Sequence, residues 1–168
     1  MRRRTFLEID LDTGVVLLEL HRLDQRLHRD PKEGPACVRR EPGTGIVVEE
    51  RYYWHGRLHR DGQPAVITYN QKSVPIVEMY YRHGLMHRDP KEGPARIERN
   101  RTGSLILIES YCLYDKLYRD PADGPNQIER REDGSVDCVS YSAPDDVRPT
   151  RSSARQRSGS AVAAKPVP

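Results

Sequence analysis

The stretch Leu27-His28-Arg29-Asp30-Pro31-Lys32-Glu33-Gly34-Pro35-Ala36 decides how this chain folds, because related stretches recur downstream. Shorter or altered copies occupy residues 58–65, 86–95 and 117–126. The arginine of the motif returns at intervals of 31, 28 and 31 residues, as Arg29, Arg60, Arg88 and Arg119. A recurring period of this size is typical of proteins built from stacked copies of one structural unit.

Each copy of the motif is preceded by a strand pattern. A glutamate lies ten residues before every motif arginine, and a ring follows two residues after the glutamate. These residues are Glu19, Glu50, Glu78 and Glu109, followed by His21, Tyr52, Tyr80 and Tyr111. Because side chains alternate along a strand, each glutamate and its ring are expected on one face. The runs 15–23, 46–54 and 105–113 are rich in branched and aromatic residues, which favour strands.

Shorter strands are expected after the motif prolines, at 36–40, 65–69, 95–99 and 126–130. Turn signals then follow at Gly43-Thr44-Gly45, Asn70-Gln71-Lys72-Ser73, Thr102-Gly103 and Asp133-Gly134. Short turns cannot make the crossover that parallel strands need. We therefore predict an all-β fold, a single-layer, twisted antiparallel meander of about four stacked β-hairpin repeats with nine or ten strands. Half units at both ends leave two edges open, so a homo-oligomer formed by edge-strand pairing is one possible assembly.

Composition limits the classes of protein to which this chain of 168 residues can belong. With 36% hydrophobic and 32% charged residues, it is lean for a thick two-layer enzyme core. No apolar run approaches the roughly 18 residues of a membrane helix, and three well-separated cysteines do not indicate a disulfide scaffold, so we expect a cytoplasmic location. We divide the chain into a basic N-terminus (1–4), a β-hairpin repeat domain (5–142) and a disordered basic tail (143–168).

The repeated charged residues are interpreted as structural. Asp bonds the backbone ahead of it, Pro fixes φ at about −65° and Gly permits positive φ, so Asp-Pro-x-Glu-Gly-Pro predicts a rigid turn. The motif arginines and the strand glutamates are expected to form a ladder across neighbouring hairpins. The motif aspartates in this interpretation are Asp30, Asp61, Asp89 and Asp120.

No catalytic residue, metal site or cofactor is predicted. His-Arg-Asp resembles the start of a kinase catalytic loop, but Pro35, Val66 and Pro94 stand where that loop needs Asn. The pairs His55/His59 and His83/His87 have the spacing of metal ligands on a helix, yet each pair straddles a hairpin turn. We interpret them as partly exposed imidazoles beside a turn. A zinc site, and with it a metal-dependent hydrolase, is the last-ranked alternative.

The aromatic residues of the central units are the best candidates for recognition. Large rings on a one-layer sheet either cover the neighbouring strand or anchor a partner. Packing is expected for most of them, with part of the group accessible because a meander buries little of either face. The group comprises Tyr52, Tyr53, Trp54, Tyr80, Tyr81, Tyr111 and Tyr114.

The stretches Tyr-Tyr-Trp-His-Gly-Arg-Leu-His-Arg-Asp-Gly-Gln-Pro-Ala-Val-Ile (52–67) and Tyr-Tyr-Arg-His-Gly-Leu-Met-His-Arg-Asp (80–89) resemble a known repeat. It is the MORN-variant repeat of bacterial, phage and giant-virus proteins, some of them antitoxin-like. The resemblance covers about residues 5–142. It implies a β-hairpin array used for protein binding, with no catalytic residue to transfer. The second unit lacks the Gly-Pro step and Tyr118 replaces the motif histidine in the fourth, so equal binding by every unit is not implied.

These observations favour a cytoplasmic, non-enzymatic protein-binding module whose partner the sequence does not name. By analogy with the family it would act as an antitoxin-like or phage-type inhibitor that occludes its partner. The alternative is a nucleic-acid accessory protein that contacts phosphates through the basic tail. That tail carries Arg148, Arg151, Arg155 and Arg157.

Overall fold

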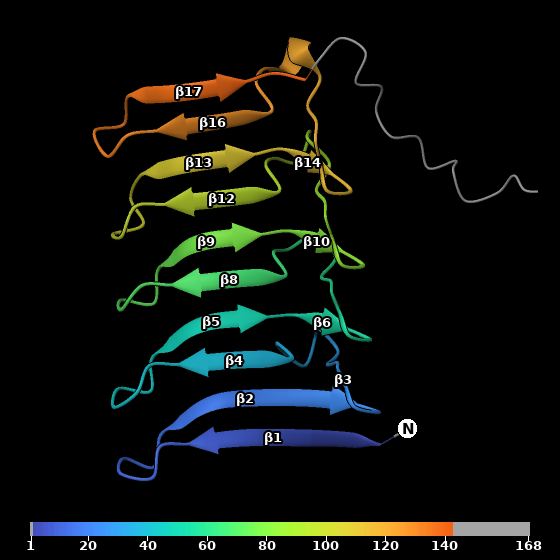
Figure 1. Ribbon diagram of the computed structural model, residues 1–168, viewed down its shortest axis with the longest axis vertical. Helices are drawn as coiled ribbons and strands as arrows, with labels where there is room; N and C mark the ends of the chain where they lie inside the picture. Colours follow the sequence, from blue (N-terminus) through green and yellow to red (C-terminus); the bar gives the residue numbers. More distant parts are fainter. Residues whose placement is uncertain (1, 143–168) are drawn as a thin grey trace, which may run out of the picture.

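The structure, a computed structural model, describes residues 2–142 as an open antiparallel sheet in which each strand pairs with the next along the path (Figure 1). This confirms the predicted all-β meander. The ten strands of the path are β1 (Arg3–Ile9), β2 (Val16–Leu23), β4 (Cys37–Arg40), β5 (Val47–Arg51), β8 (Val66–Tyr69), β9 (Pro75–Met79), β12 (Arg96–Arg99), β13 (Ile106–Ser110), β16 (Gln127–Arg130) and β17 (Val136–Ser140).

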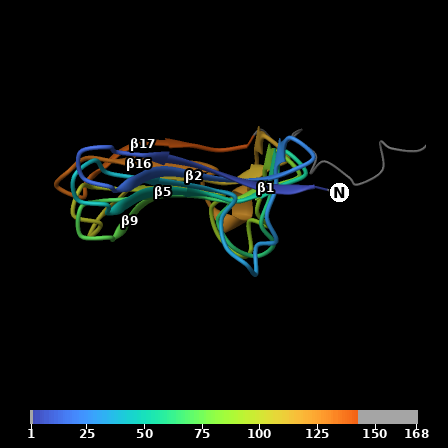
Figure 2. The same ribbon diagram turned by 90° about the horizontal axis from the view of Figure 1, so that it is seen from below.

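The sheet is a single layer, with small hairpins and motif loops projecting at one end (Figure 2). Its interior is correspondingly thin. The small residues Ala36, Ala65 and Ala95 are fully buried, whereas no large side chain of the described residues is. One cluster of buried residues forms around Tyr52 and Ile67. Each repeat thus depends on contacts with its neighbours.

The long strands depart from the prediction in the later repeats. They were expected to run unbroken through the ring position, but each stops before Tyr52, Tyr80 or Tyr111 and resumes as a two-residue strand. The tyrosine amide donates to the next repeat, as from Tyr52 N to Ala65 O (2.8 Å), while Tyr52 O accepts from His59 N (3.0 Å). These two bonds lead the chain out of the sheet and into a second hairpin.

A tight hairpin therefore follows each of the long strands β2, β5, β9 and β13 and precedes the motif. In the first repeat β3 (Arg26–Leu27) folds back on the end of β2. The turn residues have positive φ in all four hairpins, as at His55 (48°) and Gly56 (82°), which is the geometry of a type I′ turn. The other pairs are β6 (Tyr53–Trp54) with β7 (Arg57–Leu58), β10 (Tyr81–Arg82) with β11 (Leu85–Met86), and β14 (Cys112–Leu113) with β15 (Lys116–Leu117).

The motif turn has the predicted form. Asp30 Oδ1 accepts from Lys32 N at 2.9 Å, and Asp30 O accepts from Glu33 N at 2.8 Å. The third repeat has the same bonds, and the fourth tightens the turn into a 3₁₀ helix, η1 (Pro121–Asp123). Gly34 has a φ of 123°, a conformation that side chains disfavour.

Each sheet hairpin has a register shift before the last residue of its short strand. The shift falls at Glu8/Ile9 in the first hairpin and at Arg39/Arg40 in the second. The remaining hairpins have it at Thr68/Tyr69, Glu98/Arg99 and Glu129/Arg130. A bulge re-aims the side chain that follows it, so one position in every repeat is directed in the same way.

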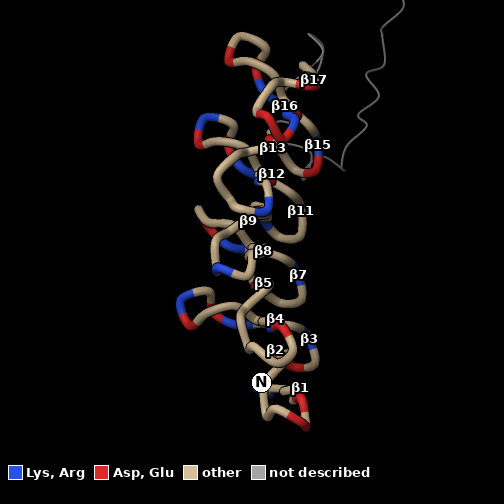
Figure 3. The backbone as a smooth tube through the Cα atoms, turned by 90° about the vertical axis from the view of Figure 1, so that its left-hand side faces the viewer, with Lys and Arg blue, Asp and Glu red and all other residues tan. Residues whose placement is uncertain are grey.

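Basic and acidic residues are interspersed along the length of the described chain (Figure 3). Among residues 2–142, no helix is long and apolar enough to cross a membrane.

Candidate functional site

In the second, third and fourth repeats the motif arginine covers the ring that lies eight residues before it, and in the first repeat it contacts the edge of that ring. Arg60 Cζ lies 3.8 Å from the ring centroid of Tyr52, and Arg88 and Arg119 lie 4.1 Å from those of Tyr80 and Tyr111. In the first repeat Arg29 Nη1 lies 2.8 Å from His21 Nε2. A guanidinium over an aromatic face is attracted by the ring quadrupole. We call this arrangement the arginine clamp.

The other side of the guanidinium is held by the motif loop. Arg88 Nη1 donates to the carbonyl of Pro94 at 3.2 Å, and each of the other motif arginines donates to the matching proline. A Cβ on Gly93 would lie 3.0 Å from Arg88 Nη1. The glycine therefore leaves the space that the guanidinium occupies, which ties the motif turn to the strand ring.

The expected ladder of motif arginines and glutamates is wrong. Only Arg29 approaches its glutamate, and it does so within one repeat, at 3.9 Å from Glu19. The glutamates instead reach the last residue of the next short strand. The distances are 3.2 Å for Glu19–Arg40, 2.6 Å for Glu78–Arg99 and 2.7 Å for Glu109–Arg130, while Glu50 accepts from the Tyr69 hydroxyl at 3.1 Å.

The cause of this change of partner is the bulge. It directs the last side chain of each short strand toward the preceding long strand, while the motif arginine is engaged in the clamp. Burial alone would raise the pKa of Glu19, but its bonds with His21 and Arg40 lower it. We call these contacts the junction pairs, because each joins one repeat to the next.

The seven candidate aromatic residues do not form one stripe. Tyr52 and Tyr111 are buried and Tyr80 is half-buried, and all three lie under clamp arginines. Tyr81 packs against the Tyr52 cluster, and Tyr53 lies half-buried in β6. Trp54 and Tyr114 lie at or beside the turns of their tight hairpins, where they contact rings of the preceding repeat.

The rings at the tight hairpins contact each other between repeats. His28 lies 4.5 Å from Trp54 and from His55, His59 stacks on His83 at 4.3 Å with an 8° interplanar angle, and His87 stacks on Tyr114 at 4.1 Å. The two histidines of each H-x-x-x-H pair thus face different repeats. We define the hairpin column as His28, Trp54, His55, His59, His83, His87 and Tyr114.

Hydrogen bonds fix the protonation of two histidines in the column. His28 Nδ1 accepts from His55 N at 3.1 Å, and His59 Nδ1 accepts from His83 N at 3.4 Å. Both rings must therefore be neutral, with the proton on Nε2. Burial lowers the pKa of His28, and the charge of His55 lowers it further. Burial also lowers the pKa of His59, although Asp61 opposes the shift.

A groove of about 640 Å³ opens beside the column, between the motif loops of the first two repeats. Trp54 and Pro31 supply apolar surface, while Lys32 and Asp61 supply opposite charges. His59 and Arg60 also line it. Four of the eight lining residues are charged, namely Asp30, Lys32, Arg60 and Asp61, so the groove combines one large ring with a polar wall rather than forming an apolar pocket.

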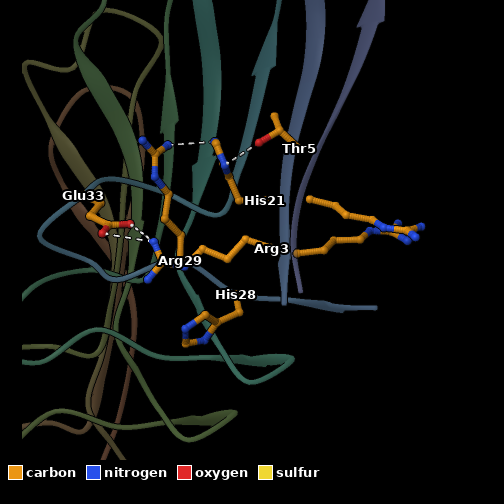
Figure 4. A pocket seen from close by; sticks show the side chains of 8 residues that line it. Arg3, Thr5, His21, His28, Arg29 and Glu33 are labelled. Carbon is orange, nitrogen blue, oxygen red and sulfur yellow. Dashed lines mark hydrogen bonds and ion pairs between the residues drawn. The ribbon is translucent and has the colours of Figure 1, made fainter. Parts of the chain in front are cut away.

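A smaller cavity of about 230 Å³ lies at the N-terminal end of the array (Figure 4). Two of its four arginines are engaged, because Arg3 pairs with Glu33 at 3.4 Å and Arg29 contacts His21. His21 Nδ1 also lies 3.3 Å from Thr5 Oγ1. We assign this cavity to the packing of the first repeat.

Within residues 2–142, no three His, Cys, Asp or Glu side chains converge in a way that could hold a metal ion. Cys37 and Cys112 are buried and Cys138 is exposed, all as free thiols. The proposed nucleic-acid contacts at Arg148, Arg151, Arg155 and Arg157 lie outside the described residues.

Sequence reasoning missed the ring stacking in the hairpin column. The signal was present, because His28 and His55 are 27 residues apart, as are His87 and Tyr114. His59 and His83 are 24 residues apart, shorter by the three residues that the second unit has lost. A repeat of this length superposes such positions on successive units.

Comparisons of this chain with protein-family models, with curated proteins and with solved structures gave no significant match. The MORN-variant resemblance thus rests on the motif residues of the chain itself.

Proposed function

We propose that the chain is a non-enzymatic protein-binding repeat module whose contact surface is the hairpin column with its adjoining motif loops. The form of action that the MORN-variant resemblance suggests is antitoxin-like or phage-type inhibition by occluding the partner. Free thiols at all three cysteines support placing this function in the cytoplasm.

The observation that carries the proposal is the row of rings beside an open groove, and most of these rings are accessible although His59 is buried. Trp54 is half-buried, and His55 and His83 are exposed. Tryptophan and tyrosine, which the column contains as Trp54 and Tyr114, are among the side chains that dominate the binding energy of protein interfaces. The column runs through successive repeats, so it offers contacts over an extended surface rather than at one point.

The experiment uses the full chain as bait in extracts of its native host. The matched baits are Trp54→Ala, which removes the largest ring of the column, and Lys72→Ala at an exposed sheet turn that lies at the other end of the strands. Because truncation of an anchor costs at least about 2 kcal/mol, we expect the Trp54 bait to lose more than about 90% of a stoichiometric partner. The Lys72 bait should retain it.

Circular dichroism and the thermal midpoint of each bait provide the check on folding. A stoichiometric partner retained equally by both baits would contradict the column as the contact surface. Repeated recovery of no stoichiometric protein would contradict protein binding itself.

A further inference from the structure

Both outer strands of the sheet have an edge that no other described residue pairs with. All residues of β1 and β17 are exposed. The apolar residues exposed there are large. Six of the ten exposed large hydrophobic side chains of the described chain belong to these two strands and the residue after β17: Phe6, Leu7, Ile9, Val136, Val139 and Tyr141.

The junctions inside the array follow one rule. The glutamate of the long strand lies directly opposite an aliphatic residue of the next short strand, as Glu109 lies opposite Ile128. Its carboxylate then reaches the residue two positions further on, which is Arg130 in this junction. The same opposite pairing occurs at Glu19–Val38, Glu50–Ile67 and Glu78–Ile97.

Both members of the junction pair are replaced at the outer edges. Val139 faces Ile128 within its hairpin as Glu109 faces Ile97, so Val139 occupies the glutamate position. Ile9 faces Val16 after the same register shift that places Arg40 opposite Val47, so Ile9 occupies the arginine position. The two positions that hold a charged pair at the internal junctions are therefore both aliphatic at the outer edges, with Val139 at one end of the array and Ile9 at the other.

This paired replacement fits a contact between the two edges. An isolated charge on an exposed edge is well solvated and discourages pairing, whereas an aliphatic residue there leaves apolar surface in water. If the edges meet in the internal register, Val139 lies directly opposite Leu7 and beside Ile9. Asp137, on the same face, is already paired with Arg131.

We propose that copies of this chain associate head to tail, with β17 of one copy pairing antiparallel to β1 of the next in the register of the internal junctions. The backbone hydrogen-bonding groups at the two edges also fit this pairing. Tyr111 N donates to Asn126 O at 2.8 Å in the last internal junction. Tyr141 N has no acceptor among the described residues, and its equivalent acceptor is Thr5 O of the next copy. Such a contact joins unlike surfaces, so it propagates into an open row of copies.

The register is tested by cysteine crosslinking of the full chain. The proposal places the exposed thiol of Cys138 directly opposite Glu8 of the next copy, as Ile108 is opposite Glu129 inside the array. Directly opposite residues have Cα atoms about 4.5 to 5.5 Å apart, which a disulfide spans. Glu8→Cys should therefore give a ladder of disulfide-linked dimers, trimers and larger species under oxidation.

The controls separate this assembly from other edge contacts. The ladder should disappear in Glu8→Cys/Cys138→Ser, and in Arg4→Cys, which shifts the thiol by four residues. Dimers of the wild type through Cys138 alone would indicate β17–β17 pairing and overturn the proposal, as would dimers of Glu8→Cys/Cys138→Ser through β1. A monomeric wild type in sedimentation up to millimolar concentration, without crosslinking of Glu8→Cys, would also overturn it.

A charge cycle tests the side-chain contact independently. Val139→Glu or Ile9→Arg alone should weaken self-association at least tenfold, because each sets an unpaired charge against an aliphatic residue. The double variant Ile9→Arg/Val139→Glu rebuilds the internal junction pair and should recover most of the lost affinity in sedimentation equilibrium. A double variant no better than the single variants would contradict the proposed register.

Discussion

The arginine clamp and the hairpin column lie in the same repeats but differ in how much they vary from one repeat to the next. The clamp keeps an arginine in all four units and a proline carbonyl beneath each one. The column varies more: its turn residues change at two of the three steps between repeats, although its motif histidines recur in three repeats as His28, His59 and His87. Its turns are Asp24-Gln25, His55-Gly56, His83-Gly84 and Tyr114-Asp115.

The difference separates two roles within one motif. A residue that recurs in every unit is explained by building the unit, because the same fold must be made four times. A residue that changes on an accessible surface gives each repeat its own contacts. The clamp is therefore where substitutions should reduce stability, and the hairpin column is where they should alter recognition.

The largest effect is expected from removing a clamped ring. Tyr111 is only 7% exposed beneath Arg119, so Tyr111→Ala should lower the free energy of unfolding by about 3–4 kcal/mol. Tyr111→Phe keeps the ring face and should lose less than about 1 kcal/mol. Urea unfolding followed by circular dichroism measures the free energy of unfolding of both variants. Equal losses would show that the contact between the ring face and Arg119 does not provide the stabilisation.

The motif glycine is expected to come next. Gly93 has a φ of 126°, and a Cβ there would lie 3.0 Å from Arg88 Nη1, so Gly93→Ala should cost about 2–3 kcal/mol. Gly62 has a φ of 68° with nothing within 4 Å, so Gly62→Ala should cost only about 1 kcal/mol. Similar losses of unfolding free energy in the two variants would show that the space needed by the Arg88 guanidinium is not the reason for a glycine at position 93.

Acid should weaken the hairpin column rather than the clamp. The pKa values of His28 and His59 are lowered from 6.5, so the folded chain binds fewer protons than the unfolded chain just below that pH. The stability that these two rings contribute is therefore fully present above pH 6.5, and it is lost as the pH falls from 6.5 through the lowered pKa values of the folded chain. Urea unfolding between pH 8 and 5.5 should show this decline.

The matched variant for the acid effect is His28→Gln/His59→Gln, which keeps a hydrogen-bond acceptor but does not titrate. Its stability should fall less than that of the wild type over the same pH range, because the two rings with lowered pKa values are absent. The single tryptophan, Trp54, lies 4.5 Å from His28, so its fluorescence should titrate with a midpoint below 6.5. An equal pH dependence in the variant would contradict the assignment to these two rings.

The smallest effect is expected at the turn of the first hairpin. Gln25 has a φ of 70°, in a turn whose counterpart is His55-Gly56 in the second repeat. Gln25→Gly should raise the free energy of unfolding by about 0.5 kcal/mol, because relief of backbone strain slightly exceeds the added chain entropy. Thermal unfolding of Gly56→Gln, with the opposite sign, is the reciprocal check.

Most of the fold follows from the sequence because the repeat is short and the connections are tight. The spacing of the motif arginines gave the number of units, and Gly-Thr-Gly, Thr-Gly and Asp-Gly turns gave the antiparallel pairing. The rigid Asp-Pro-Lys-Glu-Gly-Pro turn was also predictable, since each residue has a local conformational reason to be there.

The partners of the charged residues were not predictable in the same way. Alternation alone placed Glu78 and Tyr80 on one face, but the bulge at Glu98/Arg99 brought Arg99 rather than Arg88 to Glu78. A bulge has no simple signature in a strand of four residues. The end of strand β9 before Tyr80 could not be predicted either, because branched and aromatic residues continue through this position.

The most direct test of the clamp as the stabilising contact of each repeat is the free energy of unfolding of two arginine variants, one in the clamp and one outside it. Arg88 lies over Tyr80 and donates to Pro94, so Arg88→Ala should lose about 2–3 kcal/mol. Arg57 is exposed in a tight hairpin, so Arg57→Ala should change stability by less than about 0.5 kcal/mol. Equal losses in the two variants, or no loss in Arg88→Ala, would contradict the account.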